Sequence, residues 1–416
     1  MVKLDKKQIK HRTSPYGVLC YNGFIMSDTQ KRIDALLTRG VAEILEKESL
    51  LKKLNSGKEL RIKLGIDPTS PNIHLGRTIP LLKLKDFQDL GHKVILLIGD
   101  FTGLIGDTSD KDSERPMLSK EAIALNMKTY TDQAAKILDM SKVEIVYNST
   151  WLSKLSYFDI CEQADLFSIN QFISRENISK RLDAGKRISL RELMYPLMQG
   201  YDSVELKADV ELGGTDQKFN LLAGRDLQRH YGQEPQDLIM SPIIEGLDGR
   251  KMSSSYGNTV NLFDTPNDMF GKTMSLNDEF IIIYFTFLTR VEMDVIEKYE
   301  SELKAGTNPR DIKILLAKEI ITMYHSKEEA NKAEQYFVNT FTKKEIPDEM
   351  PDFTPSAYDV MTFLIESGLV ESKGEARRVI EQGGVKVDGT VVNSTDVTLD
   401  KGSVVQKGKI GFVRVQ

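Results

Sequence analysis

The strongest constraint on the fold is a regular alternation between short apolar segments and helix-like segments, from about residue 60 to residue 244. The helical patterns end at Gly91, cover residues 119–139 and run from about Gln217 to His230. Short buried strands that alternate with helices are typical of a parallel sheet covered on both faces. We therefore predict a doubly wound, Rossmann-like α/β domain with a mostly helical insertion at about 150–200. The strand-like segments are RIKLGI at 61–66, VILLIGD at 94–100, VEIVY at 143–147, ADVELGG at 208–214 and LIMSPII at 238–244.

The rest of the chain differs in character from this α/β segment. Residues 1–27 are basic and lack periodicity, which indicates either a loosely ordered extension or a start codon placed too early, with Met26 as the true start. A helical pattern then covers 33–45, and after residue 260 only helical patterns remain to about residue 340. The predicted domains are a basic extension at 1–27, an α/β domain at 28–255, an all-helical domain at 256–342, a proline-containing acidic linker at 343–356 and a small α+β domain at 357–416.

Composition excludes several classes of protein. The formal net charge is −5 at pH 7, so a nucleic-acid partner has to be recognised by local basic patches. The two cysteines, Cys20 and Cys161, are far apart, which excludes a disulfide framework and favours a reducing compartment. The apolar runs are too short to span a bilayer and the N-terminus does not resemble a secretory signal, so we expect a cytoplasmic protein without membrane association. The sequence offers no cluster typical of a catalytic metal site.

Two polar motifs follow predicted strands in places that suit a nucleotide triphosphate. HLGR at 74–77 lies after a strand end and a turn, where a helix begins. Free N–H groups and the positive end of the helix dipole would face phosphates there. His74 can donate a hydrogen bond, and Gly76 leaves room for a ligand against the backbone. KMSSS at 251–255 lies in a polar loop that could close over the same ligand. Taken alone, each motif could also be an ordinary capping turn or a flexible serine-rich loop.

A third feature is a polar stripe in the segment YPLMQGYD. Tyr195, Gln199 and Asp202 stand at positions i, i+4 and i+7, so they share one face of a helix. A polar face within an apolar segment needs hydrogen-bond partners. These partners could be a bound amino acid or another helix of the protein.

Together these motifs resemble the tyrosyl enzymes among the class I aminoacyl-tRNA synthetases of bacteria, and the resemblance extends over about residues 30–416. It implies ATP with Mg²⁺, L-tyrosine and tRNA-Tyr as substrates, and tyrosine–tRNA ligase activity through tyrosyl-adenylate. Residues matching those that act on the triphosphate are Thr69, His74, Arg77, Lys111, Arg115 and Lys251. Those matching ATP-binding positions are Gly65, Asp67, His74, Gly76, Gly214, Asp216, Lys251 and Ser254. Those matching tyrosine-binding positions are Asp107, Tyr195, Gln199, Asp202 and Gln217.

The chain departs from the family pattern at several of these positions. Arg77 stands where the family usually has a second histidine, and Ser254 where it often has a second lysine. In the loop GDTSDKDSER at 106–115, Thr108 and Asp110 replace a proline and a glycine, and Lys63 takes the place of a tyrosine that some members aim at the substrate hydroxyl. Two alternatives therefore stay open. One is a tryptophanyl relative, against which Asp202 argues, and the other is a weakened paralogue that acts as an RNA-binding protein.

The C-terminal segment carries a second resemblance. Residues 364–392 resemble the S-four-type RNA-binding module of ribosomal proteins and tyrosyl enzymes, with Lys373, Arg377 and Arg378 in the predicted tRNA-binding positions. From Pro355 to the end the sequence has 8 basic and 8 acidic residues, so a phosphate-binding face requires a one-sided distribution of charge. The resemblance further implies an anticodon-binding role for 256–342 and a homodimer formed through the insertion.

Overall fold

The structure, a computed structural model, describes residues 28–109, 117–343, 350–408 and 411–416. The predicted extension at 1–27, and with it Cys20, lies outside the described residues, as do Lys111 and Arg115. The chain divides into two compact units, one made of Met1–Asp264 and Ser275–Leu316 and the other of Thr265–Met274 and Ala317–Gln416. The predicted boundary at 255 is therefore not where the two units separate.

A six-stranded sheet forms the centre of the first unit, in the order β1-β6-β5-β2-β3-β4. The strands β2 to β6 pair in parallel, which confirms the predicted doubly wound α/β fold. The interior strand β3 is almost completely buried because helices cover both of its faces. The strands are β1 Glu43–Leu45, β2 Arg61–Ile66, β3 Lys93–Ile98, β4 Val143–Tyr147, β5 Val210–Gly214 and β6 Asp237–Ser241.

The edge strand β1 was not predicted. We expected a continuous helix over 33–45, but the helix α1, Asp28–Thr38, ends early and Gly40 turns the chain with a φ of 68°. Residues 43–45 then pair antiparallel with β6. The strand β1 has only three residues, and its apolar residues continue the helical pattern of α1. Periodicity alone therefore could not separate β1 from α1.

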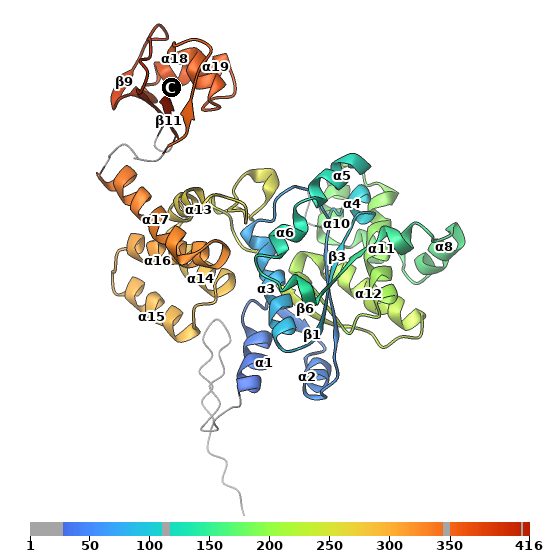
Figure 1. Cartoon of the computed structure of the whole chain (residues 1–416). Helices are drawn as coiled ribbons and strands as arrows, with labels where there is room; N and C mark the ends of the chain where they lie inside the picture. Colours follow the sequence, from blue (N-terminus) through green and yellow to red (C-terminus); the bar gives the residue numbers. More distant parts are fainter. Residues whose placement is uncertain (1–27, 110–116, 344–349, 409–410) are drawn as a thin grey trace, which may run out of the picture. The chain divides into compact units, whose positions relative to one another are not determined.

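Helices lie on both sides of the sheet in this unit (Figure 1). The helix α3, Leu75–Asp89, packs on one face against β2, β3 and β5, while α11, Leu190–Leu206, and α12, Lys218–His230, lie on the other. The insertion contains α7 Ser149–Leu152, α8 Tyr157–Asp165, α9 Ile169–Ile173, α10 Glu176–Asp183 and the first turns of α11. The unit also contains α2 Lys47–Asn55, α4 Thr102–Ile105, α14 Ile281–Leu288 and α15 Met293–Lys304, and α16 Pro309–Tyr324 crosses the division between the units.

The single helix expected over 119–139 is two helices, α5 Lys120–Met127 and α6 Tyr130–Ala134. The helix breaks at a point where side chains bond to the turn that precedes α3. Thr129 Oγ1 donates to the carbonyl of Pro71 over 3.2 Å, and the side chain of Gln133 accepts from the N–H of Ile73 over 2.7 Å. These bonds give partners to two backbone groups in the turn between β2 and α3.

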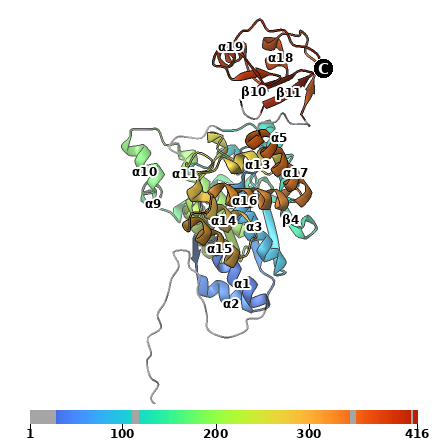
Figure 2. The same ribbon diagram turned by 90° about the vertical axis from the view of Figure 1, so that its left-hand side faces the viewer.

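The second unit contains α13 Pro266–Met274 and α17 Lys327–Phe337, which contact each other through Phe270 and Phe337. Its C-terminal part has α18, Val360–Glu366, and α19, Lys373–Glu381, packed over a five-stranded sheet in the order β7-β11-β10-β8-β9 (Figure 2). Its strands are β7 Asp352–Phe353, β8 Val385–Val387, β9 Thr390–Val392, β10 Val404–Lys407 and β11 Gly411–Val415.

Two details of this part bear on the predictions. The linker predicted at 343–356 contains β7, which pairs in parallel with β11, so its last part belongs to the sheet; residues 344–349 lie outside the described residues. The turn Asp388–Gly389 has positive φ at both residues, as a two-residue hairpin between β8 and β9 requires. Within the described ranges, no helix combines the length and apolar character needed to cross a bilayer.

Candidate active site

One cavity of about 300 Å³ opens at the carboxyl ends of β2 and β5. The chain runs from β2 outward to β3 and β4 and later returns to β5 on the other side, so this is the point where ligands bind in doubly wound sheets. Of the residues predicted to bind ATP or tyrosine or to act on the triphosphate, every one within the described ranges lines this cavity. They are Gly65, Asp67, Thr69, His74, Gly76, Arg77, Asp107, Tyr195, Gln199, Asp202, Gly214, Asp216, Gln217, Lys251 and Ser254.

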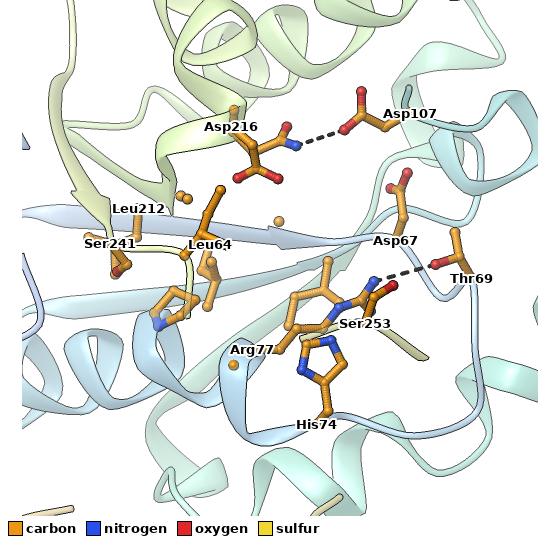
Figure 3. A pocket seen from close by; sticks show the side chains of 18 of the residues that line it. Leu64, Asp67, Thr69, His74, Arg77, Asp107, Leu212, Asp216, Ser241 and Ser253 are labelled. Carbon is orange, nitrogen blue, oxygen red and sulfur yellow. Dashed lines mark hydrogen bonds between the residues drawn. The ribbon is translucent and has the colours of Figure 1, made fainter. Parts of the chain in front are cut away.

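Arg77 is fixed beside the turn that follows β2. Its Nη1 donates to the hydroxyl of Tyr130 over 3.3 Å, and its Nη2 donates to Thr69 Oγ1 over 3.4 Å. The hydroxyl of Tyr130 in turn donates to the carbonyl of Ser70 over 2.7 Å. Figure 3 shows Arg77, Thr69 and His74 together on one side of the cavity. The guanidinium is held there by neutral hydroxyl groups, so its charge is available to an anion.

The loop with the KMSSS motif is folded against the beginning of α3. The N–H of Gly76 points at Met252 Sδ over 3.1 Å, and Ser254 Oγ lies 3.5 Å from Ser70 Oγ. A Cβ at position 76 would lie 3.4 Å from that sulfur and 3.2 Å from the His74 ring. Glycine at 76 therefore permits close packing between the two motifs, a reason that the sequence had not indicated.

Lys251 connects the same loop to the end of β5. Its Nζ lies 3.2 Å from Asp216 Oδ2. A Cβ at Gly214 would approach Asp216 Oδ1 to 2.4 Å, so glycine is needed for this carboxylate to take its position. Asp107 and Asp216 lie across the cavity from Arg77 and His74 (Figure 3).

Asp202 is the most deeply buried carboxylate of the cavity, with 2% of its surface exposed. The indole N–H of Trp151 donates to its Oδ1 over 2.8 Å, and the amide of Asn148 donates to its Oδ2 over 3.2 Å. Burial raises the pKa of Asp202 to about 7, while the charge of Lys63 and these two hydrogen bonds act in the opposite direction. The residue can thus change its charge near neutral pH.

Tyr195 and Asp67, predicted to bind different substrates, are bonded to each other. The hydroxyl of Tyr195 donates to Asp67 Oδ2 over 2.7 Å, and Thr102 Oγ1 donates to Asp67 Oδ1 over 2.7 Å. Burial raises the pKa of Tyr195 well above its usual value, and the Asp67 carboxylate adds to the effect, so the phenol stays a donor. A Cβ at Gly99 would come within 2.0 Å of Asp67 Oδ1, so glycine at that position lets this carboxylate keep its place.

The two glutamines of the site are oriented by one asparagine. Asn220 Nδ2 donates to Gln199 Oε1 over 3.1 Å and to Gln217 Oε1 over 2.9 Å. Gln217 Nε2 donates to Asp107 Oδ2 over 2.7 Å. An amide side chain has an oxygen that accepts and an N–H₂ group that donates. These hydrogen bonds therefore fix the orientations of both glutamine side chains.

Sequence reasoning missed the residues that support these groups. Trp151, Asn148, Thr102, Asn220 and Gly99 matched no motif, although each contacts or adjoins a predicted site residue. One signal was available: Asn148 directly follows the predicted strand at 143–147 and Gly99 lies near the end of the one predicted at 94–100, and the carboxyl ends of parallel strands meet at one edge.

The predicted tRNA-binding residues Lys373, Arg377 and Arg378 are exposed on α19. Two other basic residues of this C-terminal part lie near acidic side chains. Lys407 Nζ lies 2.8 Å from Glu375 Oε1, and Arg414 lies 3.9 Å from Asp352. Lys373, Arg377 and Arg378 thus present their positive charges on one helix, as a phosphate-binding face requires.

Comparisons with known proteins agree with this arrangement. Residues 55–342 match the family of tRNA synthetases class I (W and Y), and residues 360–405 match the S4 domain. The chain is 48% identical to the tyrosine–tRNA ligase of Carboxydothermus hydrogenoformans over 93% of this chain and 98% of that protein. It is 49% identical to the tyrosine–tRNA ligase of Haemophilus influenzae over 92% of this chain and 96% of that protein.

Solved structures show the same fold. A tyrosyl-tRNA synthetase from Archaeoglobus fulgidus, complexed with L-tyrosine, superimposes with a TM-score of 0.59 at 25% identity and covers 74% of this chain and 99% of that chain. A mitochondrial tyrosyl-tRNA synthetase from Aspergillus nidulans, truncated at its C-terminus, has a TM-score of 0.62 at 21% identity and covers 74% of this chain and 94% of that chain. The chain belongs to the tyrosyl-tRNA synthetases of class I, with an S4 domain at its C-terminal end.

Proposed function

We propose that this chain is a tyrosine–tRNA ligase, which activates tyrosine with ATP and transfers it to the 3′-terminal adenosine of tRNA-Tyr. The observation that carries the proposal is the position of Asp202. A buried carboxylate, suited to accept the hydrogen of a phenol, lines the same cavity as both motifs predicted to bind the triphosphate. One ligand can therefore place its phenol at Asp202 and its carboxylate towards ATP.

In the first step the tyrosine carboxylate attacks the α-phosphate of ATP and pyrophosphate leaves. The carboxylate is already ionised at neutral pH, so the step needs alignment and charge stabilisation, not a general base. His74, Arg77 and Lys251 supply the donors for the phosphates, with Thr69 beside them. Lys111 and Arg115, predicted for the same role, lie outside the described residues. Mg²⁺ would enter with ATP as part of the substrate.

The tyrosine end of the cavity recognises both ends of the amino acid. Asp202 accepts the phenolic O–H, and Tyr195, Gln199, Gln217 and Asp107 surround the α-amino group. Gly65, Gly76 and Gly214 let the adenosine approach the backbone, and Asp216 is placed for the ribose hydroxyls. A site built to bond a hydroxyl rejects an analogue that lacks it, an effect for which tyrosyl-tRNA synthetases are themselves the usual example.

In the second step a ribose hydroxyl of the terminal adenosine attacks the tyrosyl carbonyl, and AMP leaves. We assign anticodon binding to residues 256–342 and further phosphate contacts to Lys373, Arg377 and Arg378 on α19. Phosphate contacts of exposed basic side chains supply much of the affinity for nucleic acids. Because aminoacylation serves translation, we place the protein in the cytoplasm.

We also propose a homodimer formed through the insertion. Several large apolar side chains of this segment are exposed: Tyr157 by 83%, Phe158 by 75% and Leu190 by 78%. Exposed apolar groups of this size gathered on one segment are typical of an interface. The double variant Tyr157→Glu/Phe158→Glu should sediment as a monomer, whereas a wild-type protein that sediments as a monomer would contradict the proposal.

The test of the function is ATP–pyrophosphate exchange with each of the proteinogenic amino acids. We expect exchange with tyrosine only, followed by charging of tRNA-Tyr. Exchange with tryptophan instead would identify a tryptophanyl relative. Tight tRNA binding without any exchange would identify an RNA-binding paralogue, for which Arg77, Ser254 and Asp110 are the motivation; Asp110 lies outside the described residues.

A further inference from the structure

A buried ion pair lies beneath the tyrosine end of the cavity. Lys63 stands in the middle of the central strand β2 with 0% of its surface exposed, and Glu211 stands beside it on β5 with 1% exposed. The two residues are register partners on the parallel strands, and their Nζ and Oε1 atoms are 2.9 Å apart. Positions of this kind normally hold valine, isoleucine or leucine.

Lys63 connects the sheet to one turn of α11. Besides the bond to Glu211, its Nζ donates to the carbonyl of Gln199 over 2.9 Å and to Ser203 Oγ over 2.8 Å. An ammonium group has three N–H donors, so all of them are used. The turn held in this way includes Asp202, which lies between the two residues that Lys63 contacts.

Glu211 fixes the side chain of Gln199. Its Oε1 accepts from Gln199 Nε2 over 3.3 Å, and its Oε2 accepts from Ser203 Oγ over 3.1 Å and from Gln236 Nε2. Because Gln199 donates to Glu211, its amide oxygen is turned to Asn220. The ion pair therefore determines the orientation of one predicted tyrosine ligand and the backbone position of another.

The stability of the fold does not account for such a pair. Two charges taken out of water lose their hydration, and replacing a buried ion pair by apolar residues of similar size is often neutral or stabilising. A lysine and a glutamate on central strands therefore add little stability compared with two apolar residues. The effect of the pair has to be sought in the groups that it holds.

We propose that Lys63 and Glu211 are positioning residues that hold Gln199 and Asp202 for tyrosine and thereby set the selectivity for a phenol over a phenyl ring. This inference rests on the proposed function. The charges fit the role as well: burial raises the pKa of Asp202, the positive charge of Lys63 lowers it, and Glu211 raises it. Lys63 thus helps to keep the carboxylate ionised and able to accept a hydrogen bond.

The test separates positioning from mere stabilisation by removing the pair in two ways. Lys63→Met alone leaves Glu211 buried without its counter-charge, so the melting temperature should fall by several degrees. The double variant Lys63→Met/Glu211→Met removes both charges and should recover most of that stability. If positioning is the role, the KM for tyrosine in the double variant stays raised about tenfold, equal to about 1.4 kcal/mol, while the KM for ATP stays within about twofold of wild type.

Two further variants test the positioning role. Lys63→Arg keeps the charge but presents a planar fork that cannot make the same three contacts, so the KM for tyrosine should rise here too. Lys83→Met is the matched control: Lys83 is another buried lysine, but it bonds the carbonyls of Ala35 and Leu36 and does not line the cavity. That variant should lose stability without any change in the KM for tyrosine.

Binding can be followed without catalysis through Trp151, because it is the one tryptophan of the sequence and it bonds Asp202. Its fluorescence on addition of tyrosine should show weaker binding in the double variant, and the preference for tyrosine over phenylalanine in exchange should fall. Wild-type KM and wild-type preference in the double variant or in Lys63→Arg would overturn the inference. If the wild-type protein showed no tyrosine-dependent exchange, the proposed function itself would fail.

Discussion

At the scale of single residues, the site works through a few polar groups whose environment sets their charge and direction. Asp202 is the clearest case, since burial raises its pKa to about 7 and two donors from α7 and its N-terminal end hold both oxygens. Arg77 shows the opposite situation, a cation held by neutral hydroxyl groups that leave its charge for an anion. Both properties lead to measurable expectations.

The first expectation concerns pH. Below a pKa of about 7, Asp202 is protonated in the free protein and is a poorer acceptor for the phenol. The value of kcat/KM for tyrosine should therefore rise as pH increases through 7, because kcat/KM reports groups of the free enzyme. Because folding raises the pKa of Asp202 from its usual value of 3.8 to about 7, the free energy of unfolding should fall as pH rises between these two values. A profile that is flat around neutrality, or that keeps its rise in Asp202→Asn, would contradict this assignment.

The second expectation concerns Arg77. Replacing it by methionine removes a fixed charge from the triphosphate end, so exchange should slow by about 10²-fold, as for other groups that stabilise developing charge. Arg77→Lys keeps a charge without the fork and should recover part of the rate. Tyrosine binding, followed by Trp151 fluorescence, should not change. A normal exchange rate in Arg77→Met would remove Arg77 from the proposed machinery.

At the scale of elements, the sequence predicted most of what the apolar pattern alone determines. The strands β2 to β6 are short apolar segments between turn signals, and they were found close to their observed bounds. The edge strand β1 and the break at Thr129 depend on partners far away in the chain, namely β6 and the Pro71 carbonyl. No local pattern records such a partner.

The same reason explains which site residues could be predicted. Motif residues such as His74 and Lys251 are recognisable because their neighbours in sequence identify them. Trp151 acts on Asp202, Asn220 on Gln199 and Gly99 on Asp67, all residues from other elements of the fold, so only the folded chain brings out their role. The ion pair of Lys63 and Glu211 belongs to this second group, since β2 and β5 are separated by most of the α/β domain.

An element-scale expectation follows from the end of β3. Gly99→Ala would place a Cβ within 2.0 Å of Asp67 Oδ1 and 2.3 Å of Thr102 Oγ1, so the network that holds Tyr195 has to shift. We expect a loss of about 1–3 kcal/mol of stability, as for other overpacked sites, together with a raised KM for tyrosine. Gly271→Ala, inside α13 where a Cβ would meet nothing within 4 Å, is the control; it should gain a little stability from the helix preference of alanine and leave exchange unchanged. Equal behaviour of the two variants would show that the contact at Gly99 is unimportant.

At the scale of the whole molecule, activation and RNA binding are assigned to different parts of one chain. The cavity belongs to the first unit, whereas the S4 domain and its basic helix α19 belong to the second. A change of charge on α19 should therefore act on tRNA alone. Lys373→Glu/Arg377→Glu/Arg378→Glu should leave ATP–pyrophosphate exchange unchanged and weaken tRNA charging, with a shallower dependence of tRNA affinity on salt, by about one unit of slope for each lost phosphate contact.

Loss of exchange in that triple variant, or unchanged charging of tRNA-Tyr, would contradict the separation of roles. Lys401→Glu is a suitable control, because Lys401 is an exposed basic residue of the same domain that lies outside α19.

Asp202 and the phosphate-facing motifs are proposed to form one site for tyrosine and ATP. The most direct test is amino-acid-dependent ATP–pyrophosphate exchange by the wild-type protein and by Asp202→Asn. We expect exchange with tyrosine and not with phenylalanine or tryptophan in the wild type, and loss of the preference for tyrosine in the variant. Exchange driven by another amino acid, or a preference for tyrosine that survives the change at 202, would contradict it.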